Sequence, residues 1–312
     1  MKEKTVKAIQ SKLIYIISCV LIFALLVMVL AVFDMLPTQN EIKDFFGYRK
    51  ELDPEKDFIK VFDSGEAESI MICSNGEVVL IDTGLYENRL DLTSELWDMG
   101  VKRIDAVFLS HIHDDHVGGL PNLVENFYVK NLVLPDLENS KEESLFTVQK
   151  ARNDVLNSGG NSYTAVQGMS ANCGDFEITV LGYYSGLKEE NDRSLFLMAE
   201  YNGIKFLFTG DASKTAERKL IDDNINFDCD ILKVGHHGSG SSTSDEFLAI
   251  ATPEYSVISC GYKNQYSHPN EALLERLEKA KSKIYRTDLH GDVTFHFYEN
   301  QYTVSAEKLI LN

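Results

Sequence analysis

The chain has 312 residues, 25% of them charged, and its formal net charge is −18. A chain of this length forms one large domain or two small ones. The acidic excess repels nucleic acid and anionic lipid headgroups over the screening length of about 8–10 Å, which argues against a protein that binds DNA through a broad basic face.

The first predicted element is an uncharged, mostly apolar stretch at residues 13–33. A helix of this length just spans a hydrocarbon core of about 30 Å. The tail at residues 1–12 carries four lysines and one glutamate, so the positive-inside rule places the tail in the cytoplasm and the rest of the chain outside. We therefore predict a single-pass protein of the cell membrane whose main domain is extracytoplasmic.

Two other interpretations of this stretch are a cleavable signal peptide and a lipoprotein signal. A signal peptide has a shorter apolar run of about 7–15 residues and a small-residue cleavage site, and neither is evident here. The segment IISC, which ends at Cys19, faintly resembles a lipoprotein signal, but the apolar run continues as far as Phe33. An uncleaved anchor fits better, and cleavage near residue 33 would change only where the protein acts.

Residues 34–57 are polar and charged and hold two of the six prolines, which indicates a linker. We predict that one folded domain spans residues 58–312. Residues 34–312 carry 26 basic and 47 acidic residues, a net charge of −21. This part of the chain also contains four widely spaced cysteines, without the paired spacing of a thiolate zinc site. They form either two disulfides or buried free thiols; they are Cys73, Cys173, Cys229 and Cys260.

Beyond residue 57, strand and helix patterns alternate in two halves of similar size. The first half predicts strands at 57–65, 67–84, 105–110 and 129–136, with helices at 89–100, 118–127 and 141–157. The second half predicts strands at 175–184, 194–211, 229–239 and 255–261, helices at 244–252 and 270–282, and a hairpin at 293–306. Asn75-Gly76 and Asn202-Gly203 are strong signals for tight hairpin turns. The pattern favours two sheets with helices outside and chemistry on the loops at strand ends.

Histidines and aspartates recur at the ends of these strands. They are Asp82, His111, His113, Asp115, His116, Asp211, His236 and His237. Alternate residues of an extended loop point the same way, so His111 and His113 can hold one ion. Asp115 and His116 then turn toward a second ion, and Asp211 can bridge the two. Imidazole and carboxylate ligands suit zinc, and also manganese or iron.

Each of these residues also has an ordinary interpretation. A single loop histidine is usually a surface residue, and the sequence TGD at 209–211 is common in turns. Considered together, however, so many titratable groups beside apolar strands cost stability unless a metal or an ion network compensates. The set therefore favours a metal site.

The segment SHIHDDHVGG, with LIDTG before it and FTGD after it, resembles the metallo-β-lactamase superfamily. NDRSLFLMAEYNGIKFLFTGD, ILKVGHHGSGSSTSDEFLAIATPEYSVISCGYKNQYSHP and IYRTDLHGDVTF narrow the resemblance to the metallo-β-lactamase domain of ComEC-type competence proteins. The resemblance covers roughly residues 58–298. It implies an α/β fold, the αββα sandwich, with a two-metal hydrolytic site at the sheet edges.

The resemblance also implies roles for individual residues. Two divalent ions, zinc or else manganese, would lie about 3.5–4 Å apart, hold a bridging hydroxide and polarise the bond it attacks. Asp115 would orient that hydroxide, and Asp82 would brace the ligand loop. His237 is the expected ligand of the second ion, and His236 would contact the substrate or support the site. His268, in the sequence YSHP, either faces the cleft or is structural.

Several features depart from the family pattern. The many-spanning channel of competence proteins has no counterpart here, so we expect no DNA translocation by this chain. The family signature close to D-V-G-Q-G-D appears as FDSGEAES, with Glu66, Ala67 and Glu68 in altered places. Asn191 stands where the superfamily has a third metal-binding histidine, and its weaker amide ligand predicts a loose first site. The position of Lys233 on its strand assigns it no role.

The sequence thus predicts a membrane-anchored, metal-dependent hydrolase and, more narrowly, a phosphodiesterase. The resemblance implies nuclease action, whereas the charge of −21 disfavours nucleic acid and fits a small phosphodiester, such as a headgroup or a cell-wall substituent, at least as well. The same fold also allows hydrolysis of a lactone or another ester. A further alternative is a non-catalytic binding module that keeps one metal as a structural clamp, which Asn191 and the altered segment at 62–69 would support.

Overall fold

A computed structural model of the chain describes residues 2–32, 50–138 and 140–308. The chain divides into two compact units, residues 1–49 and residues 50–312. Most of the predicted linker at 34–57 lies outside the described residues.

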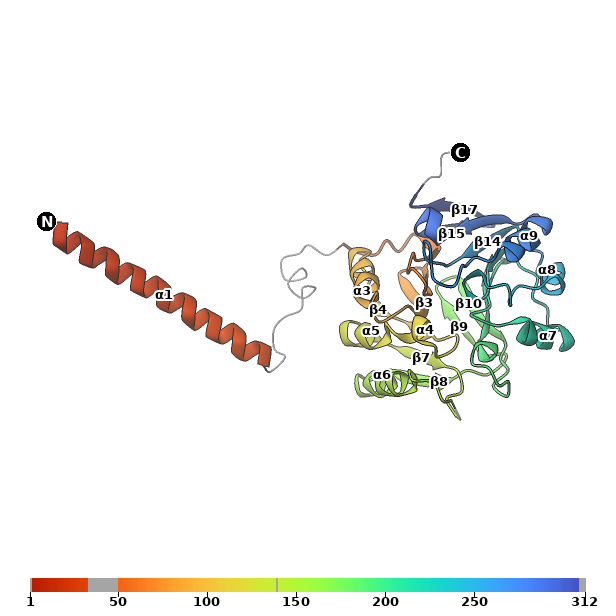
Figure 1. Cartoon of the computed structure of the whole chain (residues 1–312), viewed down its shortest axis with the longest axis horizontal. Helices are drawn as coiled ribbons and strands as arrows, with labels where there is room; N and C mark the ends of the chain where they lie inside the picture. Colours follow the sequence, from red (N-terminus) through yellow and green to blue (C-terminus); the bar gives the residue numbers. More distant parts are fainter. Residues whose placement is uncertain (1, 33–49, 139, 309–312) are drawn as a thin grey trace. The chain divides into compact units, whose positions relative to one another are not determined.

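The first unit contains the helix α1 (Lys2–Val32), drawn in red in Figure 1. Its window Lys12–Val29 has a mean hydropathy of 2.7, and none of that window is buried inside the structure. By length and composition this helix can cross a membrane, although an N-terminal signal sequence has the same properties.

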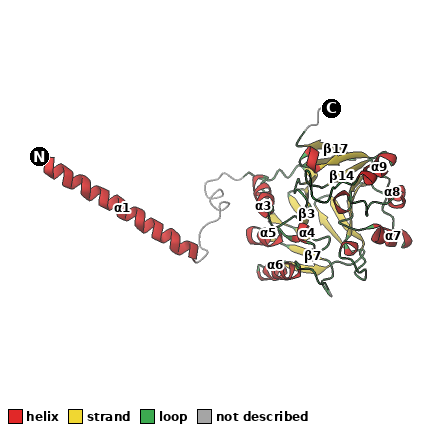
Figure 2. Cartoon of the chain, in the orientation of Figure 1, coloured by secondary structure: helices red, strands yellow, loops and turns green. Residues whose placement is uncertain are grey.

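The described residues of the second unit form two large mixed sheets (Figures 1 and 2). The first has the strand order β17-β16-β1-β2-β3-β5-β7-β8. Its strands are β1 Asp57–Val61, β2 Ser69–Ser74, β3 Glu77–Thr83, β5 Ala106–Phe108, β7 Asn131–Leu134, β8 Asn161–Thr164, β16 Val293–Tyr298 and β17 Gln301–Ala306. A separate small pair joins β4 (Arg103–Ile104) to β6 (Tyr128–Val129).

The second sheet has the strand order β15-β14-β13-β12-β11-β10-β9. Its strands are β9 Ser170–Cys173, β10 Phe176–Gly182, β11 Phe196–Tyr201, β12 Ile204–Phe208, β13 Ile231–Lys233, β14 Tyr255–Ile258 and β15 Lys283–Arg286. Both predicted Asn-Gly turns are confirmed: Asn75 and Gly76 join β2 to β3, Asn202 and Gly203 join β11 to β12, and all four residues have positive φ. Two successive positive φ angles give the turn whose twist matches a hairpin.

Apolar residues arrange these elements as helix, sheet, sheet and helix layers. Along β3, Val79 and Ile81 belong to the core between the two sheets, while Val78 and Leu80 belong to the core beneath the helices. This alternation buries the strand on both faces. The helices outside the first sheet are α3 Arg89–Asp98, α5 Leu120–Asn126 and α6 Leu145–Asn157; those outside the second are α7 Lys214–Asp222, α8 Asp245–Ala251 and α9 Glu271–Lys279 (Figure 2).

The remaining described helices are short. They are α4 Asp114–Val117, α10 Thr287–His290 and the 3-10 turns η1 Asn191–Arg193 and η2 His236–Gly238. The sequence patterns did not predict α7, nor the strands β8, β9 and β15. The predicted helix at 118–127 is α5, preceded by the separate turn α4. The four cysteines of this unit are buried free thiols. Of the two alternatives for these cysteines, disulfides or free thiols, the structure therefore has the free thiols.

Candidate metal centre

The predicted site residues follow strands that run in parallel within each sheet. Asp82 lies at the end of β3, and His111 follows β5, which pairs with β3 in parallel. In the second sheet, Asp211 follows β12 and His237 follows its parallel neighbour β13. The carboxyl ends of parallel strands meet at one edge, and α4 adds Asp115 and His116 there.

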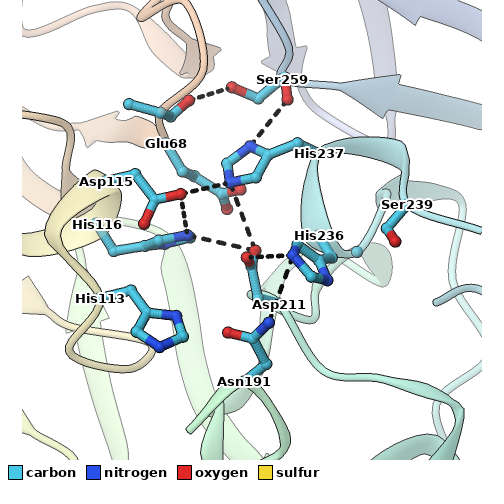
Figure 3. A network of polar contacts seen from close by, with 12 residues as sticks. Glu68, His113, Asp115, His116, Asn191, Asp211, His236, His237, Ser239 and Ser259 are labelled. Atoms are coloured by element: carbon cyan, nitrogen blue, oxygen red, sulfur yellow. Dashed lines mark hydrogen bonds and ion pairs between the residues drawn. The ribbon is translucent and has the colours of Figure 1, made fainter. Parts of the chain in front are cut away.

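Four side chains from the two sheets converge at this edge (Figure 3). The possible ligand atoms of Asp115, His116, Asp211 and His237 all lie within 4.8 Å of one another. The His116 Nε2 atom is 3.3 Å from Asp211 Oδ1, and the His237 Nε2 atom is 3.3 Å from Asp115 Oδ2. We call this set the Asp115 cluster.

Hydrogen bonds on the far side of each ring fix which nitrogen faces the cluster. Asp82 Oδ2 accepts from His116 Nδ1 at 2.7 Å, and the Ser259 carbonyl accepts from His237 Nδ1 at 3.0 Å. In its neutral form each ring therefore directs the Nε2 lone pair toward the cluster, which is the usual arrangement for metal-binding histidines. Asp82 also accepts from the backbone N–H and the hydroxyl of Ser110, both at 2.7 Å. The sequence assigned no role to Ser110, although it directly precedes His111 in SHIHDDHVGG, or to Ser259, which ends the strand-like run YSVIS.

The Asp115 cluster fits a divalent cation. His116 Nε2, His237 Nε2 and Asp211 Oδ1 are buried and have no hydrogen-bond partner among the described residues. Buried polar atoms without partners are costly, and three of them aimed at one point are satisfied together by one positive ion. Two imidazoles and two carboxylates are suitable ligands for zinc or manganese.

A second group of candidate ligands shares Asp211 with this cluster. The His111 Nε2 and His113 Nδ1 atoms are 3.1 Å apart. The His236 Nε2 atom lies 3.5 Å from Asp211 Oδ2 and 3.4 Å from Asn191 Nδ2. The structure thus places Asn191 beside the other candidate ligands, with a buried Oδ1 that has no partner among the described residues.

Charge coupling keeps the carboxylates of the Asp115 cluster ionised. Burial alone would raise the pKa of Asp211, but His237 and His116 lower this pKa well below its usual value. Burial would likewise raise the pKa of Asp115, and His116 and His237 again lower it. Burial lowers the pKa of His111 well below its usual value, and His116 lowers it further, which favours the neutral imidazole that binds metals.

The backbone at the centre is held in an unusual conformation. Asp82, His236 and His237 all have positive φ, between 50 and 59°. This left-handed region is costly for residues with a side chain, and such strain concentrates at functional sites. Gly118 and Gly119, which follow α4, come so close to the β3 loop that a Cβ atom on Gly119 would lie 2.1 Å from the Thr83 carbonyl oxygen.

A cavity of about 500 Å³ opens over the two groups. Besides candidate ligands it is lined by four acidic residues, and none of its lining residues is lysine or arginine; the four are Glu66, Asp114, Glu142 and Glu143. His268 also lines the cavity, with its ring centroid 5.7 Å from that of His236 and 5.8 Å from that of Tyr266. Of the two roles considered for His268, its position fits the one facing the cleft.

The fold and this site match a known family. Residues 65–167 match the family model described as the metallo-beta-lactamase superfamily. The chain has the metallo-β-lactamase fold. The predicted αββα fold is thereby confirmed, and this fold implies a metal-dependent hydrolase.

Curated relatives confirm the narrower resemblance of this metallo-β-lactamase domain to ComEC-type competence proteins. ComE operon protein 3 of Bacillus subtilis is 29% identical over 281 residues, and competence protein ComA of Neisseria gonorrhoeae is 30% identical over 260 residues. Each match covers 80% of this chain but 34% of the relative. The chain thus spans about a third of the length of these relatives.

Solved structures with low sequence identity share the fold of the metallo-β-lactamase domain. The CmlA β-hydroxylase E377D mutant has a TM-score of 0.54 at 16% identity, with 86% of this chain and 58% of that chain covered. YhfI of Bacillus subtilis, a metallo-β-lactamase-fold protein, has a TM-score of 0.51 at 13% identity, with 74% and 96% covered. At such identities the likeness concerns the fold alone.

Proposed function

We propose that the protein is a membrane-anchored phosphodiesterase that uses two divalent ions, zinc or manganese. The observation that carries the proposal is the position of Asp211 at one cavity. Its Oδ1 faces the Asp115 cluster, and its Oδ2 faces His236, which lies beside Asn191. The Asp115 cluster would hold one ion. His111, His113, Asn191 and Asp211 would hold the other.

Divalent ions at such a site act as Lewis acids and make bound water a nucleophile near neutral pH. The protein's own part is orientation. Asp115 Oδ2 lies 3.3 Å from His237 Nε2, at the cavity side of its cluster, where it can align an attacking water. Asp82 keeps the His116 ring in place from the opposite side. His236 and His268 line the cavity, where they can donate hydrogen bonds to a phosphoryl oxygen or to the leaving group.

The charge of the cavity supports a small diester as the substrate. Its acidic lining, without lysine or arginine, offers little attraction to a polyanion beyond that of the ions themselves. A neutral or cationic substituent next to the scissile phosphate would meet Glu66 and Glu143 instead of being repelled by them. We therefore favour a small diester, such as a lipid headgroup or a cell-wall substituent, over nucleic acid.

The N-terminal helix supports a location at the membrane. The lysines of the tail favour a cytoplasmic N-terminus by the positive-inside rule, with the hydrolase domain outside. In that orientation the enzyme would meet headgroups and cell-wall polymers directly.

The test is metal content together with turnover of bis-p-nitrophenyl phosphate by the detergent-solubilised full chain, with and without added zinc or manganese. About two ions per chain and metal-dependent cleavage are expected. One tightly held ion without cleavage would replace the proposal with the structural clamp. Two ions without diester cleavage, but with cleavage of a lactone or carboxylic ester, would assign a different hydrolase.

A further inference from the structure

A buried ion pair crosses from one sheet to the other beneath the candidate metal centre. The Lys233 Nζ atom lies 2.5 Å from Glu68 Oε2, and both side chains are completely buried. Lys233 ends β13, while Glu68 directly precedes β2. Removing two charges from water is expensive, and a buried ion pair is weak evidence for stability in itself. The position of this pair therefore indicates a role other than stabilising the fold.

The main chain of Glu68 is bound to the segments that carry ligands in the first sheet. Its N–H donates to the Asp115 carbonyl at 3.0 Å, and its own carbonyl accepts from the Gly84 N–H at 2.8 Å. Asp115 is a candidate ligand, and Gly84 follows Asp82 by two residues. A displacement of Glu68 would thus be transmitted to both segments.

The Lys233 side of the pair is bound to the segments of the second sheet. The ammonium group also donates to the Val234 carbonyl at 3.0 Å, three residues before His237. His237 Nδ1 donates to the Ser259 carbonyl, and the Ser259 hydroxyl donates to the Ala67 carbonyl at 2.8 Å (Figure 3). Since Ala67 precedes Glu68, the contacts form a closed ring that passes through both sheets.

We propose that the Glu68–Lys233 pair is a positioning element that sets the spacing between Asp115 and His237. The inference rests on the proposed metal site and goes beyond it, because it assigns a role to two residues that neither line the cavity nor belong to the candidate ligands. The altered family signature at residues 62–69 then has a function, because its Glu68 supplies the first-sheet end of the ring of contacts.

The test is the affinity of the full chain for Zn²⁺ alone, measured by competition with a chromophoric chelator. The double variant Lys233→Met with Glu68→Leu removes both charges, keeps the net charge and fills similar volume, a change that buried pairs often tolerate. We expect about a 10- to 100-fold loss of Zn²⁺ affinity at an unchanged melting temperature, as found for residues that orient metal ligands.

A matched control is Lys60→Met with Asp292→Leu. This control removes a different ion pair of the same domain, one that is only partly buried. This control is expected to bind Zn²⁺ as the wild type does. If the first double variant binds Zn²⁺ with wild-type affinity, the inference is overturned. If that variant fails to fold, Glu68→Asp keeps the charge but shortens the side chain, and wild-type affinity in this variant would overturn the inference equally.

Zn²⁺ binding separates this inference from the proposed function. A wild type that binds two ions but cleaves no diester refutes the phosphodiesterase, and the affinities of the variants still decide the role of the pair. A wild type that binds neither Zn²⁺ nor Mn²⁺ overturns both.

Discussion

His236 and His237 are adjacent in the chain, yet their rings have different partners. His237 Nε2 lies 3.3 Å from Asp115 Oδ2, and its Nδ1 donates to a backbone carbonyl. His236 Nε2 faces Asp211 Oδ2 and the amide of Asn191. Left-handed backbone at both residues separates the two directions, so His237 faces the Asp115 cluster while His236 faces the cavity beside Asp211 and Asn191.

This geometry predicts different results for two alanine substitutions. His237→Ala removes a member of the Asp115 cluster and is expected to lose about one bound ion per chain, because such sites need their complete ligand set. His236→Ala leaves Asp115, His116 and His237 intact and is expected to retain that ion. Metal content after dialysis measures both. The opposite result would make His236 the ligand.

The buried cysteines predict low thiol reactivity. Burial raises the pKa of Cys73 and of Cys260 to about 12, and also raises that of Cys173 and Cys229. A raised pKa keeps a thiol protonated, and therefore unreactive, until the pH approaches that value. At about pH 8, a disulfide reagent should label Cys19 at most in the folded chain, and four more thiols after unfolding without reductant. Labelling of all five before unfolding would contradict the burial, and missing thiols afterwards would indicate disulfides.

At the scale of elements, the helix pair α4 and α5 depends on its close approach to the loop after β3. The Thr83 hydroxyl donates to the His116 carbonyl, and the Gly119 N–H donates to the Gly84 carbonyl. These contacts place His116 over Asp82. Only residues without a Cβ atom allow the approach, which explains the two glycines that end HDDHVGG.

Gly119→Ala is therefore expected to lower the free energy of unfolding by about 1–3 kcal/mol or more, through overpacking against the backbone. It should also weaken metal binding, because His116 moves with α4. The matched control is Gly186→Ala, where a Cβ atom meets nothing within 4 Å and the expected change is within about 0.5 kcal/mol. Chemical denaturation of both variants measures the difference, and equal stability would refute the close-packing argument.

The elements that could be predicted from sequence are those with local signals. Asn-Gly turns and strongly apolar strands identified the hairpins β2–β3 and β11–β12. Helix α7 was missed because only Ala216, Glu217 and Leu220 are buried along a largely polar segment. Strand β15 was missed because it lies at a sheet edge and is only half-buried.

The site residues also divide into those with a local sequence signal and those without one. The spacing H-x-H-x-D-H is local, so it predicted a metal site. The convergence with Asp211 was predicted from a different signal, the position of these residues at the ends of strands. The pairing of Lys233 with Glu68 joins positions 165 residues apart. No local pattern contains such a contact. Lysines are mostly exposed, and the sequence does not distinguish a lysine that becomes buried when the two sheets pack together.

At the scale of the whole molecule, charge determines how substrates approach. Residues 34–312 have a net charge of −21, and four of the acidic residues among them line the cavity. Protein–DNA affinity usually falls as salt rises, because binding releases counterions. Here the dominant long-range interaction with a polyanion is repulsion, which salt screens.

For an oligonucleotide substrate, KM is therefore expected to fall as KCl rises from about 20 to about 200 mM. For a small neutral-substituted aryl diester, KM is expected to stay nearly constant over the same range. Steady-state kinetics with both substrates measure the two dependences. A KM for the oligonucleotide that rises with salt would indicate a basic binding surface and favour the nuclease.

The division of the Asp115 cluster between two sheets also has a consequence for how the protein matures. Asp115 and His116 belong to the first sheet, but their partners Asp211 and His237 are made about a hundred residues later. An ion therefore finds a complete coordination shell only after both sheets have formed and closed on each other. In a zinc finger the ion induces the fold, whereas here ion capture would be the final step of assembly, delayed until both halves of the domain have been made and folded.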